Sequence, residues 1–566
     1  MDRITRPYKV PHVAPVNFGN SNRIETLLRA GKLYLSLADT IALALENNLD
    51  IELQRYGALI ADANLLRSQA GGLLRGVLPA VTQGPSGAPA QAGQATGIST
   101  SAAQQASAAA SGNSGTVISQ TGTVIPNFDP VITGFLRWAH STNPQTNSFV
   151  SGADTLVNSN DLANFSYQQG FATGTTVALG LSNSHLSSTS LRSELNPSIS
   201  STLSLNVTQR LLQGFGRAVN SRNIRIAKNN REVSDLVFKQ QVITTVSAII
   251  NLYWDLVSFN EDVKVKRQAL ELNQKLLNDN KKQVEIGTLA PIEIVRAEAE
   301  VANAEQDLTI SETRVLQQET ILKNALSRTG VASPSVSDAR IIPTDQIRVP
   351  AVEPIEPVQD LIATAQRSRP ELAQRRIQLE NDKISLAGSK SQLLPTLDAI
   401  LNFGNNGLAG DVSVLPLPAG SPPRTVTRYF VGGYGTVLSQ LFRRNFPDYN
   451  AGFQINIPLR NRAAQADMIL DQLNVRQREI GIQQFETQVR LDVVNAQIAL
   501  QQSRAVYQAA QKTRVFREQT LDAEQKKYAL GASTIFNVIL VQRDLALAQS
   551  AEVTALSTYS KARVQL

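Results

Sequence analysis

The feature that most constrains this fold is an internal repeat. Residues 35–69 (LSLADTIALALENNLDIELQRYGALIADANLLRSQ) resemble residues 358–392 (VQDLIATAQRSRPELAQRRIQLENDKISLAGSKSQ) in the second half of the chain. At an offset of about 321 residues, Arg55 meets Arg376 and apolar positions of the two segments coincide. Self-similarity of this kind marks a repeated structural unit. The chain therefore consists of two copies of one unit.

A second pair of matching segments lies later in each copy. Residues 286–300 (IGTLAPIEIVRAEAE) correspond to residues 530–544 (LGASTIFNVILVQRD), and both lead into alanine-rich sequence. Each copy has the same order of parts, namely a helix, a strand-like region, a very long helix, a glycine turn and a shorter helix. We therefore expect an N-terminal extension (1–34), a first repeat (35–329), a linker that contains several prolines (330–357) and a second repeat (358–566).

Two stretches without helix breakers are far longer than ordinary helices. Residues 217–286 contain neither glycine nor proline, and residues 463–530 contain only Gly481. Globular helices run about 8–20 residues, whereas at about 1.5 Å per residue each of these would reach roughly 100 Å. Their seams are rich in Ala, Gln, Asn and Ser. Such seams suit close packing in a large assembly better than a leucine-rich coiled coil.

Glycines at the ends of these helices predict helical hairpins. Gly287 and Gly531 follow the long helices, at the position where a left-handed residue ends a helix, and a shorter helix follows each of them. The helices predicted from these boundaries are 35–75, 217–286 and 291–327 in the first repeat, and 358–394, 463–530 and 534–566 in the second.

The regions between the helices alternate apolar and polar residues with a period of two. In residues 199–211 and 449–459 the polar face is mostly small and uncharged. Strands of about ten residues with one apolar face and one small polar face are typical of membrane β-barrels. The alternative, a soluble sandwich, usually carries more charge on its polar face. We expect barrel strands within residues 128–212 and 395–459.

Residues 80–126 form a low-complexity segment rich in Gly, Ala, Ser and Gln. Such sequence cannot bury enough apolar surface to order itself. We interpret it as a flexible insertion between the first helix and the first strand.

The sequence gives no sign of an enzyme. It has no cysteine, and its three histidines lie in loop-like sequence. Nucleotide-binding, zinc-protease, EF-hand and serine-hydrolase motifs are all missing, so we expect no catalytic residue, no cofactor and no metal. Basic and acidic residues are interspersed within a net charge of +7. This pattern argues against a nucleic-acid partner.

The sequence contains no targeting signal that would define the cellular compartment. The chain has no run of about 18 apolar residues that would predict a transmembrane helix. Residues 1–10 have no apolar segment typical of a signal peptide. The chain is therefore either cytosolic or the mature form of an exported protein.

In combination, these features resemble the TolC family of outer-membrane efflux proteins. The similarity covers nearly the whole chain from about residue 33 to residue 566. The segments that carry it are LSLADTIALALENN (35–48), the corner LLQGFGRA (211–218), its counterpart IPLRNRAAQAD (457–467), and the tips VEIGTLAPIEIVRAEAEVANAE (284–305) and YALGASTIFNVILVQRDLALAQ (528–549).

The resemblance implies an α+β membrane protein that forms a homotrimer. Its transmembrane β-barrel would lie in the outer membrane of a Gram-negative-type cell and contact the lipid there. A long α-helical barrel would continue it through the periplasm. The implied function is an export duct that passively conducts substrates from a tripartite efflux pump or a type I secretion system. The implied partners are a periplasmic membrane-fusion adaptor and an inner-membrane transporter.

The resemblance also assigns candidate sites. The adaptor would dock at the two turns, formed by Gly287, Thr288, Leu289, Ala290, Gly531, Ala532, Ser533 and Thr534. A periplasmic gate would lie beside them, at Glu293, Arg296, Tyr528 and Asn537. There the Tyr528 hydroxyl could bond a carboxylate and link neighbouring hairpins. The alternative role for Glu293 is to stabilise the N-terminus of its own helix.

The sequence departs from the family's pattern in three respects, and two other interpretations compete with the export duct. Ser533 replaces the family's gate arginine, and Asn537 and Leu540 replace its acidic selectivity positions. The first repeat carries additional strand-like sequence, so that we expect four strands per chain, twelve in a trimer, with six per chain as the alternative. The competing interpretations are a soluble structural coiled coil and an envelope adaptor, although an adaptor should have a single central hairpin.

Overall fold

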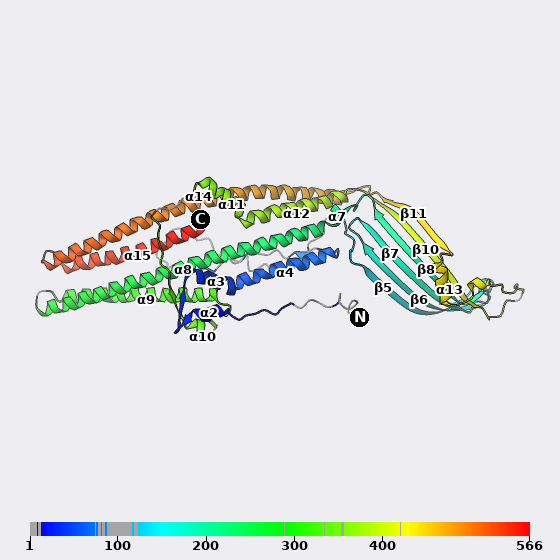
Figure 1. Cartoon of the computed structure of the whole chain (residues 1–566), viewed down its shortest axis with the longest axis horizontal. Helices are drawn as coiled ribbons and strands as arrows, with labels where there is room; N and C mark the ends of the chain where they lie inside the picture. Colours follow the sequence, from blue (N-terminus) through cyan, green and yellow to red (C-terminus); the bar gives the residue numbers. More distant parts are fainter. Residues whose placement is uncertain are drawn as a thin grey trace.

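The computed structural model describes residues 13–73, 123–287, 289–332, 334–351, 356–418 and 420–566, with residues 8, 75–76, 81, 85–87 and 116–117. The chain is elongated, with one β-sheet at one end and long helices along the rest of its length (Figure 1). Most of the predicted insertion 80–126 lies outside the described residues, apart from short pieces such as β4 (Thr116–Val117), which pairs with β3 (Arg75–Gly76).

The first helix of each repeat is broken into two. Helices α3 (Leu37–Asn47) and α4 (Leu49–Gln69) open the first repeat, and α11 (Val358–Ser368) and α12 (Pro370–Gln392) open the second. The breaks fall at Asn48 and Arg369, which are 321 residues apart and therefore equivalent in the repeat. The Asn48 side chain accepts hydrogen bonds from the backbone of Asp50 and Ile51 and so starts α4. Pro370 stands at the start of α12, where its missing N–H costs nothing.

Two long hairpins make up the rest of the helical part. The first is α8 (Arg222–Glu285) with α9 (Ile292–Leu326), preceded by the short α7 (Arg217–Asn220), and the second is α14 (Arg462–Ala529) with α15 (Ile535–Gln565). Helix α8 is central, because it packs against α3, α4, α9, α12 and α15. Among the described helices, α8 alone has a window that is long and apolar enough to cross a membrane by length and composition, a test that the core helix of a soluble protein also passes.

The sheet contains six antiparallel strands in the order β11-β10-β8-β7-β6-β5. Strands β5 (Val131–Pro144), β6 (Thr155–Gly170), β7 (Thr175–Ser188) and β8 (Leu195–Arg210) come from the first repeat; β10 (Thr396–Val412) and β11 (Pro447–Asn456) come from the second. The expectation of four strands per chain is therefore wrong. The added strands β5 and β6 are hydrogen-bonded to each other along the whole length of β5. They therefore belong to the same sheet, although the apolar and polar residues in their sequences alternate only partly.

The two faces of the sheet differ in polarity. One face carries apolar side chains in rows across the strands, such as Tyr167, Leu179, Leu205, Phe403 and Tyr449. The other face carries small polar side chains that bond across the strands, in the pairs Ser184–Asn160 (2.8 Å), Ser188–Asn158 (2.7 Å), Thr202–Asn406 (2.8 Å) and Asn402–Asn450 (2.7 Å). A wall between lipid and a polar lumen has this division.

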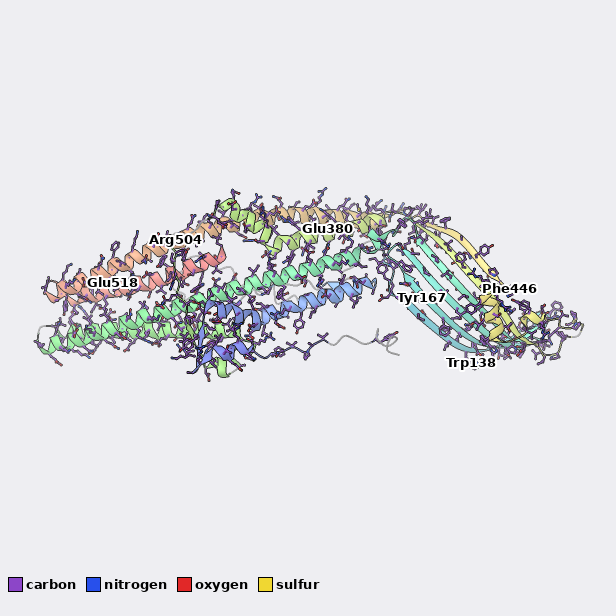
Figure 2. All side chains as sticks on the ribbon, in the orientation of Figure 1. Trp138, Tyr167, Glu380, Phe446, Arg504 and Glu518 are labelled. Carbon is purple, nitrogen blue, oxygen red and sulfur yellow. The ribbon has the colours of Figure 1, made fainter. Side chains whose placement is uncertain are left out.

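The far end of the sheet, away from the helices, is covered by a short helical segment. It comprises η3 (Arg428–Phe430) and α13 (Tyr434–Phe442), while α6 (Ser148–Ser151) lies in the β5–β6 connection. Val437 of α13 is fully buried and packs with Ile199 and Ala409 on the apolar face. Trp138 and Phe446 lie toward this end, whereas Tyr167 lies nearer the helices (Figure 2).

A small three-stranded sheet packs against the middle of the helical part. It contains β1 (Leu28–Arg29), β2 (Lys32–Leu35) and β9 (Arg340–Pro343), beside α2 (Asn22–Leu27), η2 (Gly330–Ala332) and α10 (Pro334–Ser337). The predicted N-terminal extension and the predicted linker therefore contain ordered elements, because β2 of one pairs in parallel with β9 of the other. The largest apolar core lies here, and it includes Tyr253, Leu256 and Leu322.

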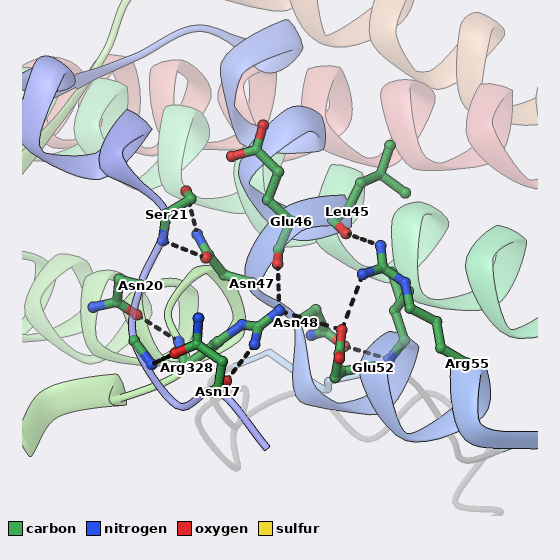
Figure 3. A network of polar contacts seen from close by, with 12 residues as sticks. Asn17, Asn20, Ser21, Leu45, Glu46, Asn47, Asn48, Glu52, Arg55 and Arg328 are labelled. Carbon is green, nitrogen blue, oxygen red and sulfur yellow. Dashed lines mark hydrogen bonds and ion pairs between the residues drawn. The ribbon is translucent and has the colours of Figure 1, made fainter. Parts of the chain in front are cut away.

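Arg328 ties this middle region together (Figure 3). Its guanidinium donates to the carbonyl oxygens of Asn17 and Glu46 and to Oε2 of Glu52 at 3.2 Å. Glu52 also accepts a bond from Arg55 at 3.0 Å. The network joins the end of α9 to the break between α3 and α4.

Candidate functional site at the hairpin tips

Both hairpin turns are built around a left-handed glycine. Gly287 has φ 82° and Gly531 has φ 75°, and a Cβ atom at either position would meet open space. The residue before each glycine is an exposed apolar side chain, Ile286 at 76% and Leu530 at 85%. The two turns therefore present the same feature, an apolar side chain beside bare backbone, at the free end of the molecule. Thr288 lies outside the described residues.

In the second turn, the polar residues are bonded within their own hairpin. The Ser533 hydroxyl donates to a carboxylate oxygen of Glu524 in α14, and this hydrogen bond, against the opposing effect of burial and with the hydrogen bond and charge of Lys527, lowers the pKa of Glu524. Nδ2 of Asn537 donates to Oγ of Ser533 at 3.4 Å. Ser533 and Asn537 thus join the start of α15 to the end of α14. Neither contact reaches the first hairpin.

Two contacts cross from one hairpin to the other near the tips. The hydroxyl of Tyr528 in α14 donates to Oε1 of Gln283 in α8 at 2.7 Å. The guanidinium of Arg296 in α9 lies 5.9 Å from the ring centroid of Phe536 in α15. The first contact is a hydrogen bond and the second is a cation–π interaction. Together they hold the two tips side by side.

Glu293 and Arg296, two of the predicted gate residues, pair with each other. Nη1 of Arg296 lies 2.8 Å from Oε1 of Glu293, whose side chain is only 15% exposed. Within one chain, the Tyr528 hydroxyl therefore bonds an amide rather than the predicted carboxylate. The link between neighbouring copies across a threefold axis stays a prediction.

Buried polar atoms without partners lie next to these contacts. Asn280 in α8 is 1% exposed, and neither Nδ2 nor Oδ1 has a hydrogen-bond partner. Oε2 of Glu293 is also buried without a partner. Each such group costs about 1–3 kcal/mol. The packing of the tips is therefore less favourable than it would be with apolar side chains.

Away from the tips, α8 and α15 meet along a polar seam. The pairs along it are Gln542–Asn273 (3.1 Å), Ser550–Asp262 (2.8 Å) and Lys561–Asp255 (2.5 Å). Asp262 also accepts a bond from Ser311 of α9 at 2.7 Å. The neutral Gln542–Asn273 bond contributes about 0.5–1.5 kcal/mol, whereas bonds to the charged Asp255 and Asp262 contribute about 1.5–3 kcal/mol each.

Sequence reasoning missed the partners of the predicted gate residues. Gln283 and Phe536 lie in continuous helical sequence without any distinguishing motif. Only the packing of the first hairpin against the second brings Gln283 to Tyr528 and Phe536 to Arg296. Within the described residues, no cluster of histidine and acidic side chains could hold a metal ion.

The comparisons with known proteins identify the family. The model of the family described as "Outer membrane efflux protein" matches residues 174–328 and 361–566, which is more than half of the chain. The chain belongs to the outer membrane efflux protein family. It is an efflux duct of the outer membrane, with its sheet in the membrane and its helices in the periplasm. The soluble coiled coil and the envelope adaptor are not favoured, and the family's members are channels rather than enzymes.

Solved structures show the same fold at low sequence identity. The Campylobacter jejuni CmeC outer membrane channel is 13% identical, with a TM-score of 0.57, over 98% of this chain and 93% of that chain. The outer membrane protein VceC from Vibrio cholerae is 12% identical, with a TM-score of 0.55, over 94% of each chain. No curated protein sequence matches the efflux protein.

Proposed function

We propose that three copies of this efflux protein form a closed duct whose hairpin tips dock a periplasmic adaptor of a tripartite pump. The duct conducts passively what the inner-membrane transporter delivers. The observation that carries this proposal is the placement of two equivalent glycine turns at one end of the chain and a lipid-facing sheet at the other. A conduit between two membranes requires this division.

The docking surface consists of residues 286–290 and 530–534. A Cβ atom at either turn glycine would meet open space, and the turns expose Ile286 and Leu530. Helix ends also leave backbone groups unsatisfied, which a partner's helices can bond. An adaptor that presents apolar helix tips would therefore find matching surface on each hairpin.

The gate consists of the contacts that hold the tips together, namely Tyr528–Gln283 and Arg296–Phe536, with Glu293 orienting Arg296. Asn537 supports the gate indirectly through Ser533. These contacts are individually weak. Docking can release them and separate the hairpins.

Valine substitutions at the turn glycines test the docking surface. Gly287→Val and Gly531→Val place a β-branched residue at positive φ, which strains the turn. Gly481→Val is the matched control, because Gly481 lies inside α14 with open space around its Cβ and no positive φ. We expect loss of dye efflux from cells for the turn variants only, with all three proteins purified as detergent-solubilised trimers.

The possible results test the trimeric duct and the docking surface separately. A wild-type protein that purifies as a monomer contradicts the trimeric duct. If the turn variants are trimeric and export normally, the docking surface lies elsewhere. Loss of the trimer in the turn variants alone would show that the glycines are only structural.

A further inference from the structure

The two edges of the membrane sheet are open in a single chain. In the strand order β11-β10-β8-β7-β6-β5, the outer sides of β5 and β11 have no partner among the described strands. Unpaired backbone groups in hydrocarbon cost several kcal/mol each, so membrane sheets close into barrels. Each edge must therefore meet another strand once the protein is in its membrane.

We propose that β5 of one copy pairs with β11 of the next copy, so that three copies close a barrel of eighteen strands, six from each. This inference rests on the proposed trimer and specifies its junction. A second copy of this chain is the occupant of both edges. The barrel is then wider than the twelve-stranded one that four strands per chain would give.

The pairing of β6 with β7 excludes the narrower closure. The family match begins at residue 174 and so includes β7, β8, β10 and β11 but neither β5 nor β6. A barrel of the matched strands alone would join β7 to β11 of the neighbouring copy. However, β6 already occupies that edge of β7, from Asn158 opposite Ser188 to Gly170 opposite Thr176. The junction is therefore displaced to β5.

Strand direction fits this junction. All six strands alternate in direction, so β5 and β11, at opposite edges of an even-numbered sheet, run antiparallel. Membrane barrels of this type have even numbers of antiparallel strands. Strand β5 has 14 residues and β11 has 10, and both meet the about 9–11 residues that a membrane strand needs.

The polarity of the two edges also matches. The apolar face of β5 carries Ile132, Leu136 and Trp138, which are 77%, 74% and 73% exposed in the single chain. The same face of β11 carries Phe453 and Ile455. An in-phase register places even-numbered residues of β5 beside odd-numbered residues of β11 and continues one lipid-facing band around the wall.

The far part of β10 cannot serve as the junction. Beyond Asn405, the edge of β10 that β11 leaves free is bonded by the segment around α13. The backbone N–H of Asn406 donates to the carbonyl oxygen of Phe446, and that of Leu408 donates to Oε1 of Gln440. Strand β11 is thus the edge that the neighbouring copy meets.

A wider barrel changes where the duct is narrow. Barrel diameter grows roughly linearly with strand number, so eighteen strands give a wall about 1.5 times as wide as twelve. At about 16–18 strands a barrel encloses an open aqueous channel. The tips, held by Tyr528–Gln283 and Arg296–Phe536, are then the constriction, and conductance reports on them rather than on the barrel. The test must therefore probe the junction directly.

Disulfide cross-linking is a direct test because the chain has no native cysteine. Phe453→Cys in β11 is combined in turn with Ile132→Cys, Leu136→Cys and Trp138→Cys in β5, which scans the register on the lipid-facing side. Phe453→Cys with Phe135→Cys is the control for the opposite face. Phe453→Cys with Leu179→Cys tests the alternative junction at β7. The readout is covalent dimers and trimers after oxidation on a non-reducing gel, with native mass measured before oxidation.

We expect one or two neighbouring β5 positions on the lipid-facing side to give most of the protein as covalent oligomers that revert on reduction. The Phe135 and Leu179 combinations should remain monomeric on the gel. Cross-linking through Leu179 overturns the inference and leaves the trimeric duct intact, as does a native trimer that no β5 position cross-links. Absence of a native trimer instead overturns the proposed function.

Discussion

The hydroxyl of Tyr528 in α14 donates a hydrogen bond of 2.7 Å to Oε1 of Gln283 in α8, and so joins the tips of two hairpins that lie 245 residues apart in the sequence. The bond is part-buried and sits between the two glycine turns. Among the described residues, Arg296 over the ring of Phe536 is a second contact that crosses between the hairpins there. Opening of the tunnel by separation of the hairpins, as we propose, would break both contacts.

Tyr528→Phe should therefore favour the open tunnel. Loss of one neutral hydrogen bond shifts the balance by about 1 kcal/mol per chain, roughly fivefold. We expect a higher open probability in planar-bilayer recordings, and a larger increase when Glu293→Ala is added, because Arg296 then loses the carboxylate that orients it. Tyr507→Phe, elsewhere on α14, is the control. Unchanged recordings with only a lower melting temperature would reduce Tyr528 and Glu293 to packing residues.

Asn280→Leu should have the opposite effect. The substitution removes two buried polar atoms that have no partner and replaces them with an apolar group of similar length. Relief of about 1–3 kcal/mol of desolvation should stabilise the closed tips. We expect a higher melting temperature and a lower open probability. Asn278→Leu, at an exposed position of the same helix, should change neither. A lower melting temperature for Asn280→Leu would mean that Asn280 has a partner in the assembled trimer.

Local sequence patterns predicted the long helices, the hairpin turns and the two-faced strands, because helix breakers and periodicity act over a few residues. The break between α3 and α4 at Asn48 could also have been predicted, because asparagine is a preferred residue at the start of a helix. Strand β9 could not have been predicted, because its four residues form a strand only through their pairing with β2 from the other end of the repeat.

The number of strands and the partners at the tips depend on contacts distant in sequence. Strand β5 has large apolar residues on both faces, such as Phe135 and Leu136, so its alternation is weak. Its membership of the sheet comes from its pairing with β6. In the same way, Tyr528 was recognisable as a polar residue beside a turn, but its partner Gln283 is defined only by the packing of α8 against the second hairpin.

Arg328→Ala should destabilise the middle of the helical part. The guanidinium bonds the Glu46 carbonyl oxygen at 3.1 Å and Glu52 at 3.2 Å, where both side chains of the ion pair are largely buried. Hydrogen bonds to charged groups contribute about 1.5–3 kcal/mol. We expect a clear fall in melting temperature, whereas Arg55→Ala, which removes the more exposed partner of Glu52, should have a smaller effect. Equal falls in melting temperature for the two variants would show that the stabilisation by these bonds does not depend on how deeply the arginine is buried.

Glu319→Gln should alter the pH dependence of stability. Burial raises the pKa of Glu319, despite the opposing attraction of Arg340 at 3.3 Å and of Lys323. Because the pKa in the folded state is above that of the unfolded chain, the unfolded state releases its proton first as the pH rises. The folded state therefore loses stability between the ordinary glutamate pKa and the raised one, and the loss persists at higher pH.

Glutamine at this position does not titrate, so that part of the pH dependence should disappear. We expect the melting temperature of Glu319→Gln relative to wild type to be higher at pH 7 than at pH 4. Glu312→Gln, whose side chain is exposed and pairs with Arg267, is the control and should show no such trend. The measurement is thermal unfolding of the detergent-solubilised protein across this range. A difference that grows toward acid pH would mean that the ion pair with Arg340 outweighs the cost of burying the charge.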